Sequence, residues 1–377
     1  MKWWHVYLAV WAAAAVLGAL LTWACRGLAP KLGLLDRPKA NTHKLHGKAT
    51  PVLGGLAMLV AWLLTIAAGL ACSEAFGRLL VHEVAAFLPG IQTVTTQLVV
   101  IVLGAIALVT IGVIDDRQPM GAFPKFAAQF CIAGAVACWG VRVTFFWSQP
   151  ILTWAITTFW ILFIVNAINF LDNMDGLAAG IATIAAFFFA FCAAMRGQYF
   201  VAVLALTTCG TACGFLMFNR PPASIFMGDA GSHFLGYILA VIGALTTYYT
   251  PAESPTPAPV LIPVLILGIP IFDVAAVVLI RWHQGRPIYV GDHMHISHRF
   301  VRMGLSRAQA VLLVLLLVFA AGAGAVTLLW LPFAGTVLIT LQTLAMLAIV
   351  SLLQFFHVNP DSTPEENTKH AEPDRAS

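Results

Sequence analysis

The side chains best suited to chemistry in this chain are five aspartates that lie where three apolar segments end. They are Asp115 and Asp116, then Asp172 and Asp175, then Asp229. If each apolar segment crosses a bilayer once, the third, fifth and seventh segments all end on the same membrane face. Carboxylates gathered near a membrane surface are ligands that suit a divalent cation. The sequence therefore predicts an acidic site on one face of a membrane.

The second aspartate pair belongs to a longer polar pattern. Asn166, Asn169, Asp172 and Asp175 recur every three residues in NAINFLDNMDG, a spacing that puts side chains on neighbouring parts of one helix face. Four polar groups near hydrocarbon are costly unless each has a partner. A helix N-cap would account for one aspartate but not for the asparagines, so the pattern favours a binding site.

Asp229 lies between two glycines in NRPPASIFMGDAGSHFLG, which begins at Asn219 and contains Ser232 at the start of the next apolar segment. Glycines let backbone N–H groups approach an anion, and a helix N-terminus favours phosphate, while Asp229 adds a hard oxygen ligand. The stretch indicates a corner that could hold both a phosphate and a magnesium ion. A simple glycine-rich turn has a similar composition.

A fourth polar stretch, GDHMHISHRF, contains Asp292, His295, His298 and Arg299. The acidic stretches offer no thiolate, so imidazolium and guanidinium donors to phosphate or sugar are favoured over a zinc site. Lys125 begins the fourth apolar segment, close in sequence to the first aspartate pair. Adjacent carboxylates favour such a nearby cation, because they repel each other when both are ionised.

The elements that must position these residues are membrane helices. The chain has 377 residues, of which 60% are hydrophobic and 10% are charged. Its apolar runs of about 20 residues match the hydrocarbon thickness of a bilayer. We expect an all-α polytopic membrane protein with about eleven crossings, one transmembrane domain over residues 1–356 and a disordered cytoplasmic tail over 357–377. The expected crossings are 3–25, 52–72, 93–114, 125–141, 151–171, 177–195, 198–218, 231–249, 259–280, 309–330 and 335–356.

Lysine and arginine residues predict the orientation. Most of them follow odd-numbered crossings, which places those ends in the cytoplasm by the positive-inside rule. The N-terminus then lies outside and the C-terminus inside. The net charge of +4 is modest, so the composition argues against a nucleic-acid partner. The stretches expected in the cytoplasm, where the catalytic loops would lie, are 26–51, 115–124, 172–176, 219–230 and 281–308.

The ordered set GVIDDR, NAINFLDNMDGLAAG, NRPPASIFMGDAGS and DHMHISHR resembles the polyprenyl-phosphate N-acetylhexosamine-1-phosphate transferases, over about residues 43–307. The resemblance implies a multi-pass enzyme of the bacterial inner membrane that moves an aminosugar phosphate from a UDP-sugar to undecaprenyl phosphate and releases UMP. It also implies Mg²⁺ as cofactor, with Mn²⁺ as a substitute, and leaves a homodimer open. Asp273 and the spacing of the histidines resemble the WecA-type branch, which implies UDP-N-acetylglucosamine as the donor.

Within this resemblance each polar stretch has an implied role. Asp229 is the leading magnesium ligand and Asp172 a second one, while Asp115 or Asp116 orients or deprotonates the lipid phosphate. The residues expected to contact substrates are Lys48, Lys125, Asn166, Asn169, Asp172, Asp175, Asn219, Ser232, Asp292, His295, His298 and Arg299.

Two positions depart from the family's usual pattern. Ser297 stands where the WecA-type branch usually has a histidine, and Asn173 replaces the first glycine of DGxDG. An MraY-like phospho-N-acetylmuramoyl-pentapeptide transferase is an alternative enzyme. A secondary transporter is an alternative of another class, but transporters place ionisable residues in mid-membrane, and only Asp273 lies well inside an expected crossing. The DG-x-x-AR signature of the CDP-alcohol phosphatidyltransferases is absent, since no arginine follows Asp175 and Gly176 at that spacing.

Overall fold

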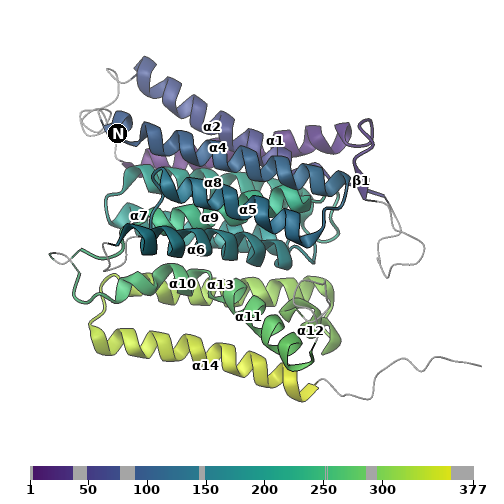
Figure 1. Cartoon of the computed structure of the whole chain (residues 1–377), viewed down its shortest axis with the longest axis vertical. Helices are drawn as coiled ribbons and strands as arrows, with labels where there is room; N and C mark the ends of the chain where they lie inside the picture. Colours follow the sequence, from purple (N-terminus) through teal and green to yellow (C-terminus); the bar gives the residue numbers. More distant parts are fainter. Residues whose placement is uncertain are drawn as a thin grey trace, which may run out of the picture.

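The computed structural model describes residues 3–36, 49–76, 90–143, 149–250, 252, 254–285 and 295–357. In these ranges the protein is a bundle of helices with one short β-hairpin (Figure 1). The elements are α1 (Trp3–Leu28), β1 (Leu35–Asp36), β2 (Thr50–Pro51), α2 (Gly54–Phe76), α4 (Gly90–Arg117), α5 (Ala122–Cys138), α6 (Pro150–Leu171), α7 (Leu177–Met195), α8 (Tyr199–Asn219), α9 (Gly228–Leu245), η1 (Ala258–Leu261), α10 (Ile262–Ile266), α11 (Gly268–His283), α12 (Ile296–Arg302), α13 (Arg307–Thr327) and α14 (Phe333–His357).

The expected all-α polytopic fold is confirmed. Nine helices of the described residues are long and apolar enough to cross a membrane. Two further expected crossings take other forms. The segment expected at 125–141 is α5, an apolar helix of 17 residues, and the segment expected at 259–280 is broken, because η1 and α10 meet α11 at a bend of 69°.

Three predicted boundaries were wrong in a way that matters for the polar residues. Helix α4 continues to Arg117, so Asp115 and Asp116 form its last turn and do not lie in a loop. Helix α9 begins at Gly228, which puts Asp229 in its first turn. Part of the predicted loop 281–308 is the helix α12. The acidic residues are therefore held on helix ends, which are stiffer supports than loops.

Helix α9 is the centre of the bundle. It packs against α2, α4, α6, α7 and α8, and 83% of its 18 residues are buried inside the protein. Its mean hydropathy of 1.2 is the lowest of the nine spans, against 2.7 for α4. A helix surrounded by protein and not by lipid can carry polar groups, provided that neighbouring helices supply their partners. The buried Ser232 and His233 of α9 illustrate this.

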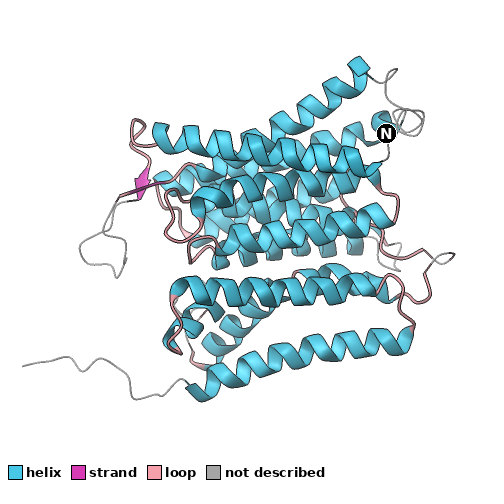
Figure 2. Ribbon diagram, turned by 180° about the vertical axis from the view of Figure 1, so that it is seen from behind, coloured by secondary structure: helices cyan, strands magenta, loops and turns pink. Residues whose placement is uncertain are grey.

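The ends of α4, α6 and α9 that carry the aspartates share one end of the bundle with the β-hairpin and α12, on the right in Figure 1 and on the left in Figure 2. The hairpin pairs Leu35 with Pro51. A parallel bridge from Val52 to Phe226 then joins it to the segment that precedes α9. Helices α10 to α14 form a separate layer below α6 and α7 in Figure 1, with α14 outermost.

Two glycines let neighbouring helices approach the start of α9 closely. A Cβ atom at Gly55 of α2 would collide with the backbone of Gly231, and one at Gly112 of α4 would collide with the backbone of Ala230. Side chains at these positions would push α2 and α4 away from α9. The close approach of α4 is what brings the aspartates of its last turn beside Asp229.

We expect Gly112→Ala to destabilise the protein by about 1–3 kcal/mol, because overpacking a rigid backbone contact forces helices apart. The thermal unfolding midpoint in detergent should fall. Gly69→Ala in α2 is the matched control, since a Cβ atom there meets nothing within 4 Å, and alanine has the higher helix propensity. Equal midpoints for the two variants would contradict the proposed close packing.

Candidate active site

A lysine between two aspartates lies at the centre of the shared helix end. Lys125 of α5 places its Nζ atom 2.6 Å from Asp229 Oδ2 and 2.9 Å from Asp115 Oδ2. The three residues come from α5, α9 and α4. The expected gathering of the first aspartate pair, Asp229 and Lys125 is therefore confirmed as geometry. Half-buried carboxylates this close together need a cation, and Lys125 supplies one.

The other oxygen of Asp229 is held by α6. Asn169 donates through Nδ2 to Asp229 Oδ1 at 2.7 Å and to Ser232 Oγ at 2.8 Å. Asn169 therefore joins the end of α6 to the first turn of α9. Asp229 faces the shared cluster with both oxygens, in a helix N-terminal turn where backbone dipoles favour a negative charge.

Asp116 caps the start of α9 from the neighbouring helix. Its carboxylate accepts hydrogen bonds from the backbone N–H groups of Asp229, at 2.8 Å, and Ala230, at 3.3 Å. Gly228 precedes them with φ at +66°, and a Cβ atom there would lie 2.5 Å from Asp116 Oδ2. Both the left-handed backbone and the lack of space require glycine. The cap uses one acceptor position on each Asp116 oxygen and leaves others open.

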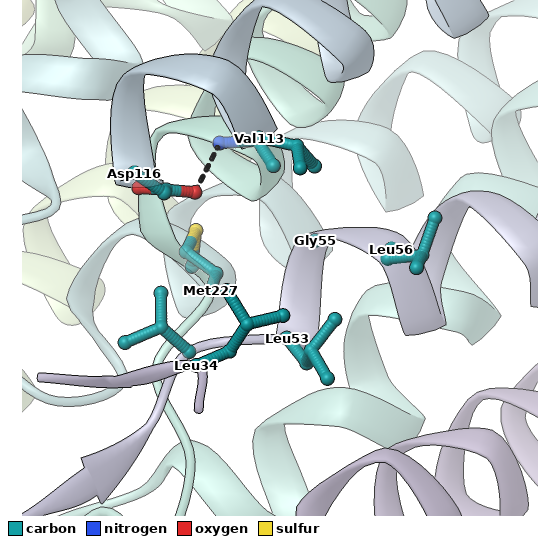
Figure 3. Close-up of a pocket in the computed structure, with 9 residues that line it drawn as sticks. Leu34, Leu53, Gly55, Leu56, Val113, Asp116 and Met227 are labelled. Atoms are coloured by element: carbon teal, nitrogen blue, oxygen red, sulfur yellow. Dashed lines mark hydrogen bonds between the residues drawn. The ribbon is translucent and has the colours of Figure 1, made fainter. Parts of the chain in front are cut away.

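Asp116 also borders a small apolar pocket (Figure 3). The pocket lies between the hairpin, α2, α4 and the start of α9, and the bond from Ala230 to Asp116 crosses its edge. Its lining is Leu34, Val52, Leu53, Gly55, Leu56, Val113, Asp116, Met227 and Ala230. Asp116 is the charged group in this lining, so the carboxylate stands between hydrocarbon and the polar cluster.

Asp175 and Asn219 organise the segment before α9. Asp175 Oδ2 accepts from the N–H of Ala223 at 2.9 Å. Asn219 accepts from Gly176 N–H at 3.0 Å and donates to Ile225 O at 2.9 Å. Asn219 is only 3% exposed, so in this structure its amide holds the backbone of this segment. Its expected contact with phosphate stays a prediction.

Asp172 differs from the other aspartates, because its half-buried carboxylate forms no hydrogen bond with any described residue. It follows the last residue of α6 and faces Asp229, Asp116 and Asp175. Burial, and then the negative charges of these three residues, raise the pKa of Asp172 to about 8. A carboxylate without a donor among other carboxylates is the environment that a bound cation stabilises.

The residues present suit a magnesium ion that keeps part of its coordination shell for substrate and water. No group of three histidine, cysteine, aspartate or glutamate side chains in the described ranges could form a complete cage. Magnesium is usually held by one or two carboxylates together with substrate phosphates and water. Asp172 and Asp229 would provide the carboxylates.

Helix α12 is docked onto this end of the bundle by Asp273. Asp273 of α11 accepts from Ile296 N–H with Oδ1 and bonds His295 Nδ1 with Oδ2, both at 2.7 Å. His295 is 6% exposed and packs beside Phe170. His295 therefore helps to anchor α12, whereas the half-buried His298 and Arg299 follow it on the helix. Lys48 and Asp292 lie outside the described residues.

Comparison with known proteins identifies the family. A model of glycosyl transferase family 4 matches residues 98–247, which span α4 to α9. The chain is 34% identical, over 82% of its length and 81% of the relative's, to a probable undecaprenyl-phosphate N-acetylglucosaminyl 1-phosphate transferase of Bacillus subtilis. This chain belongs to glycosyl transferase family 4.

Two other relatives have names that differ in the lipid or the sugar. A decaprenyl-phosphate N-acetylglucosaminephosphotransferase of Mycolicibacterium smegmatis is 29% identical over 93% of this chain and 89% of its own length. A phospho-N-acetylmuramoyl-pentapeptide-transferase of Clostridioides difficile is 30% identical, but over 57% of this chain and 67% of its own length. The family membership and the apolar helices together make this a multi-pass bacterial membrane protein.

The amide group of Asn166 bonds Gln129 and the Leu162 carbonyl, and within the described part of the chain it forms no hydrogen bond with Lys125, Asp115 or Asp229. It lies one turn deeper in α6, where it donates to Gln129 Oε1 at 2.8 Å. Gln129 in turn lies 3.0 Å from His233 through their Nε2 atoms. Gln129 and His233, both buried, are one turn along their helices from Lys125 and Asp229. Together with the half-buried Asn166 they form a polar layer next to the site. In this structure the Asn166 amide group therefore serves helix packing, and its expected substrate contact stays a prediction.

Sequence reasoning missed Gln129 and assigned no role to Asp273, Asn173 or Ser297. Gln129 carried a usable signal, because an isolated amide inside an apolar helix needs a buried partner. Its partner, however, lies 37 residues away on α6. Only helix packing determines which side chain that is.

Proposed function

We propose that the protein transfers N-acetylglucosamine 1-phosphate from UDP-N-acetylglucosamine to undecaprenyl phosphate at the cytoplasmic membrane face, and that UMP is released. The observation that carries the proposal is Lys125 between Asp115 and Asp229, at the end of a membrane bundle where α4, α5, α6 and α9 meet. The names of the Bacillus and Mycolicibacterium relatives, both N-acetylglucosamine phosphate transferases that act on a polyprenyl phosphate, support the choice of sugar and lipid class.

The reaction requires two anions to approach each other. An oxygen of the lipid phosphate attacks the sugar-side phosphorus of the diphosphate, and the bond from that phosphorus to the bridging oxygen breaks, so that UMP leaves with the bridging oxygen. Cationic groups must offset the repulsion and stabilise the charge that spreads over the transferred phosphoryl group. Lys125 is positioned to do this, since it already neutralises two carboxylates of the cluster.

Magnesium is the cofactor that we propose, with manganese as a substitute. Asp229 and Asp172 would hold it. The support is the Asp172 carboxylate, which has no hydrogen-bond donor among the described residues and lies near the negative charges of Asp229, Asp116 and Asp175. When bound, the ion would neutralise negative charge on the diphosphate. Asn169 keeps Asp229 in place through the bond to its Oδ1 atom. Ser232 shares the same Asn169 amide, so it supports this arrangement from the next turn of α9.

The lipid phosphate fits the side of the cluster that Asp116 occupies. Asp116 lies beside apolar side chains of α2 and α4 (Figure 3), and Leu56 and Ile114 of these helices are exposed on the outside of the bundle. We place the hydrocarbon chain of the lipid against these exposed side chains, with its phosphate next to Asp116. One oxygen of Asp116 or Asp115 would orient the lipid phosphate or accept its proton. The UDP-sugar would then lie on the side of α12, where His298 and Arg299 offer donors for phosphate or sugar.

Purified protein in detergent with undecaprenyl phosphate and magnesium should release UMP from UDP-N-acetylglucosamine. A panel of UDP-sugars should include UDP-N-acetylmuramoyl-pentapeptide, because the Clostridioides relative carries that activity in its name. UMP release with the pentapeptide donor alone would move the protein to the cell-wall branch. No UMP release with any donor would refute the proposed reaction.

A further inference from the structure

A side-chain hydrogen bond ties the segment between Asp172 and Asp175 to α12. Ser297 Oγ donates to Asn173 Oδ1 at 2.8 Å. Ser297 is fully buried, so its hydroxyl group would lose the full energy of a hydrogen bond if this acceptor were removed. The two positions that depart from the family's usual pattern are therefore hydrogen-bonded to each other, although they lie 124 residues apart.

Both polar atoms of the Asn173 amide form hydrogen bonds. Its Nδ2 group donates to the backbone carbonyl of Phe170 at 2.8 Å, and its Oδ1 atom accepts from Ser297. Phe170 adjoins Asn169 in the last turn of α6, and Asp172 adjoins Asn173. The Asn173 side chain thus connects the end of α6, the acidic segment and α12.

Helix α12 depends on such ties for its position. It has seven residues, which is too short for an isolated helix to be stable in water. At its N-terminus it is anchored by Asp273 of α11 through Ile296 N–H. The bond from Ser297 to Asn173 is a second anchor, from a different direction. The buried Ile296 and Phe300 also pack α12 against its neighbours. His298 and Arg299 directly follow Ser297 on the helix, so the hydrogen bond of Ser297 lies next to them in the chain.

We propose that the Asn173–Ser297 pair is a positioning clamp that sets the place of His298 and Arg299 relative to the acidic segment, and that it determines how well the nucleotide-sugar donor binds. The proposal rests on the proposed function, because it assigns the side of α12 to the donor. The clamp residues act through their neighbours and do not contact the reacting phosphates. Their loss should therefore affect donor binding more than the chemical step or the lipid acceptor.

The first test is a double-mutant cycle with Ser297→Ala, Asn173→Ala and the double variant. Each single variant should raise KM for UDP-N-acetylglucosamine about tenfold, and kcat and KM for undecaprenyl phosphate should change less than about twofold. The double variant should be no worse than either single variant, because the two residues share one interaction. Ser297→Thr keeps the hydroxyl group and should restore most of the donor affinity.

Ser351→Ala is the matched control. It also removes a serine hydroxyl, but Ser351 is half-buried where Ser297 is fully buried, and its bond goes to the Leu347 carbonyl of its own helix, α14. It should leave both KM values unchanged. A donor KM that stays at the wild-type value in the clamp variants, or effects that add in the double variant, would overturn the clamp.

A second measurement separates failure of the clamp from failure of the proposed function. Hydrogen exchange of the backbone amides of α12 needs no turnover, and it should accelerate in Ser297→Ala and Asn173→Ala but not in Ser351→Ala. If the wild-type protein releases no UMP, the proposed function fails, and unchanged exchange in α12 would then overturn the clamp as well. Faster exchange with unchanged donor KM in an active enzyme would reduce the pair to a structural contact and refute the proposal.

Discussion

Asp229→Asn is expected to lower kcat/KM for UMP release by about 10³-fold, with a clear loss of magnesium dependence. The carboxylate is the proposed metal ligand and the partner of Lys125 at 2.6 Å. Removing one preorganised charge from such a centre costs about 10²–10³ in rate, and the loss of a metal ligand adds to this. The measurement is initial UMP release over a magnesium titration.

The asparagine variant keeps the shape of the side chain, so folding can be separated from chemistry. Asn169 donates to one oxygen of Asp229 and Lys125 to the other, so the single amide oxygen of the variant keeps one of these two bonds. We expect the thermal unfolding midpoint to fall by a few degrees. Ser351→Ala, which removes a hydroxyl group that bonds within its own helix α14, serves again as the control for differences between protein preparations. Full turnover in Asp229→Asn at ordinary magnesium concentrations would show that Asp229 is a structural ion-pair partner and not a metal ligand.

Lys125→Met is expected to lower the rate of UMP release and to strengthen magnesium binding. The rate should fall about 10²- to 10³-fold, because the variant lacks the cation that would stabilise phosphate charge. Magnesium should bind about tenfold more tightly to the substrate-free protein, because the positive charge that competes for Asp115 and Asp229 is gone. Calorimetric titration with magnesium measures the second change without any turnover.

Lys125→Arg is the informative companion variant. It keeps the charge but replaces a compact ammonium group by a planar guanidinium group, so magnesium affinity should stay near the wild-type value while the rate still falls. If Lys125→Met weakened magnesium binding, the metal would not compete with Lys125 for the Asp229 carboxylate. The assignment of the metal to Asp229 would then be wrong.

A cluster made from helix ends has a physical advantage for this kind of chemistry. The polar groups sit where helices leave the apolar layer, so their backbone supports are rigid while their side chains reach water. Gly112 and Gly55 permit the close helix contacts that this arrangement needs. Asp116 then satisfies the exposed N–H groups at the start of α9. The same residues therefore serve both the packing of the bundle and the shape of the site.

The sequence by itself determined the membrane class, the order of the helices and the end of the bundle at which the aspartates gather. These follow from the lengths of the apolar runs and from the alternation of successive crossings, which are properties of the chain read in order. The cluster of Asp115, Asp229 and Lys125 was predicted for this reason. The family resemblance rested on the same local stretches.

The tertiary structure alone decided which polar groups are partners. Asn166 was expected at the substrate but bonds Gln129, and Asn219 was expected to meet phosphate but bonds backbone groups. Asn173 and Ser297 were noted separately as departures, and their mutual bond was not foreseen. The physical reason is that a hydrogen bond depends on a few tenths of an ångström and on the rotation of each helix about its axis. Those quantities are set by the packing of whole helices against α9, and the spacing of residues along the chain does not contain them.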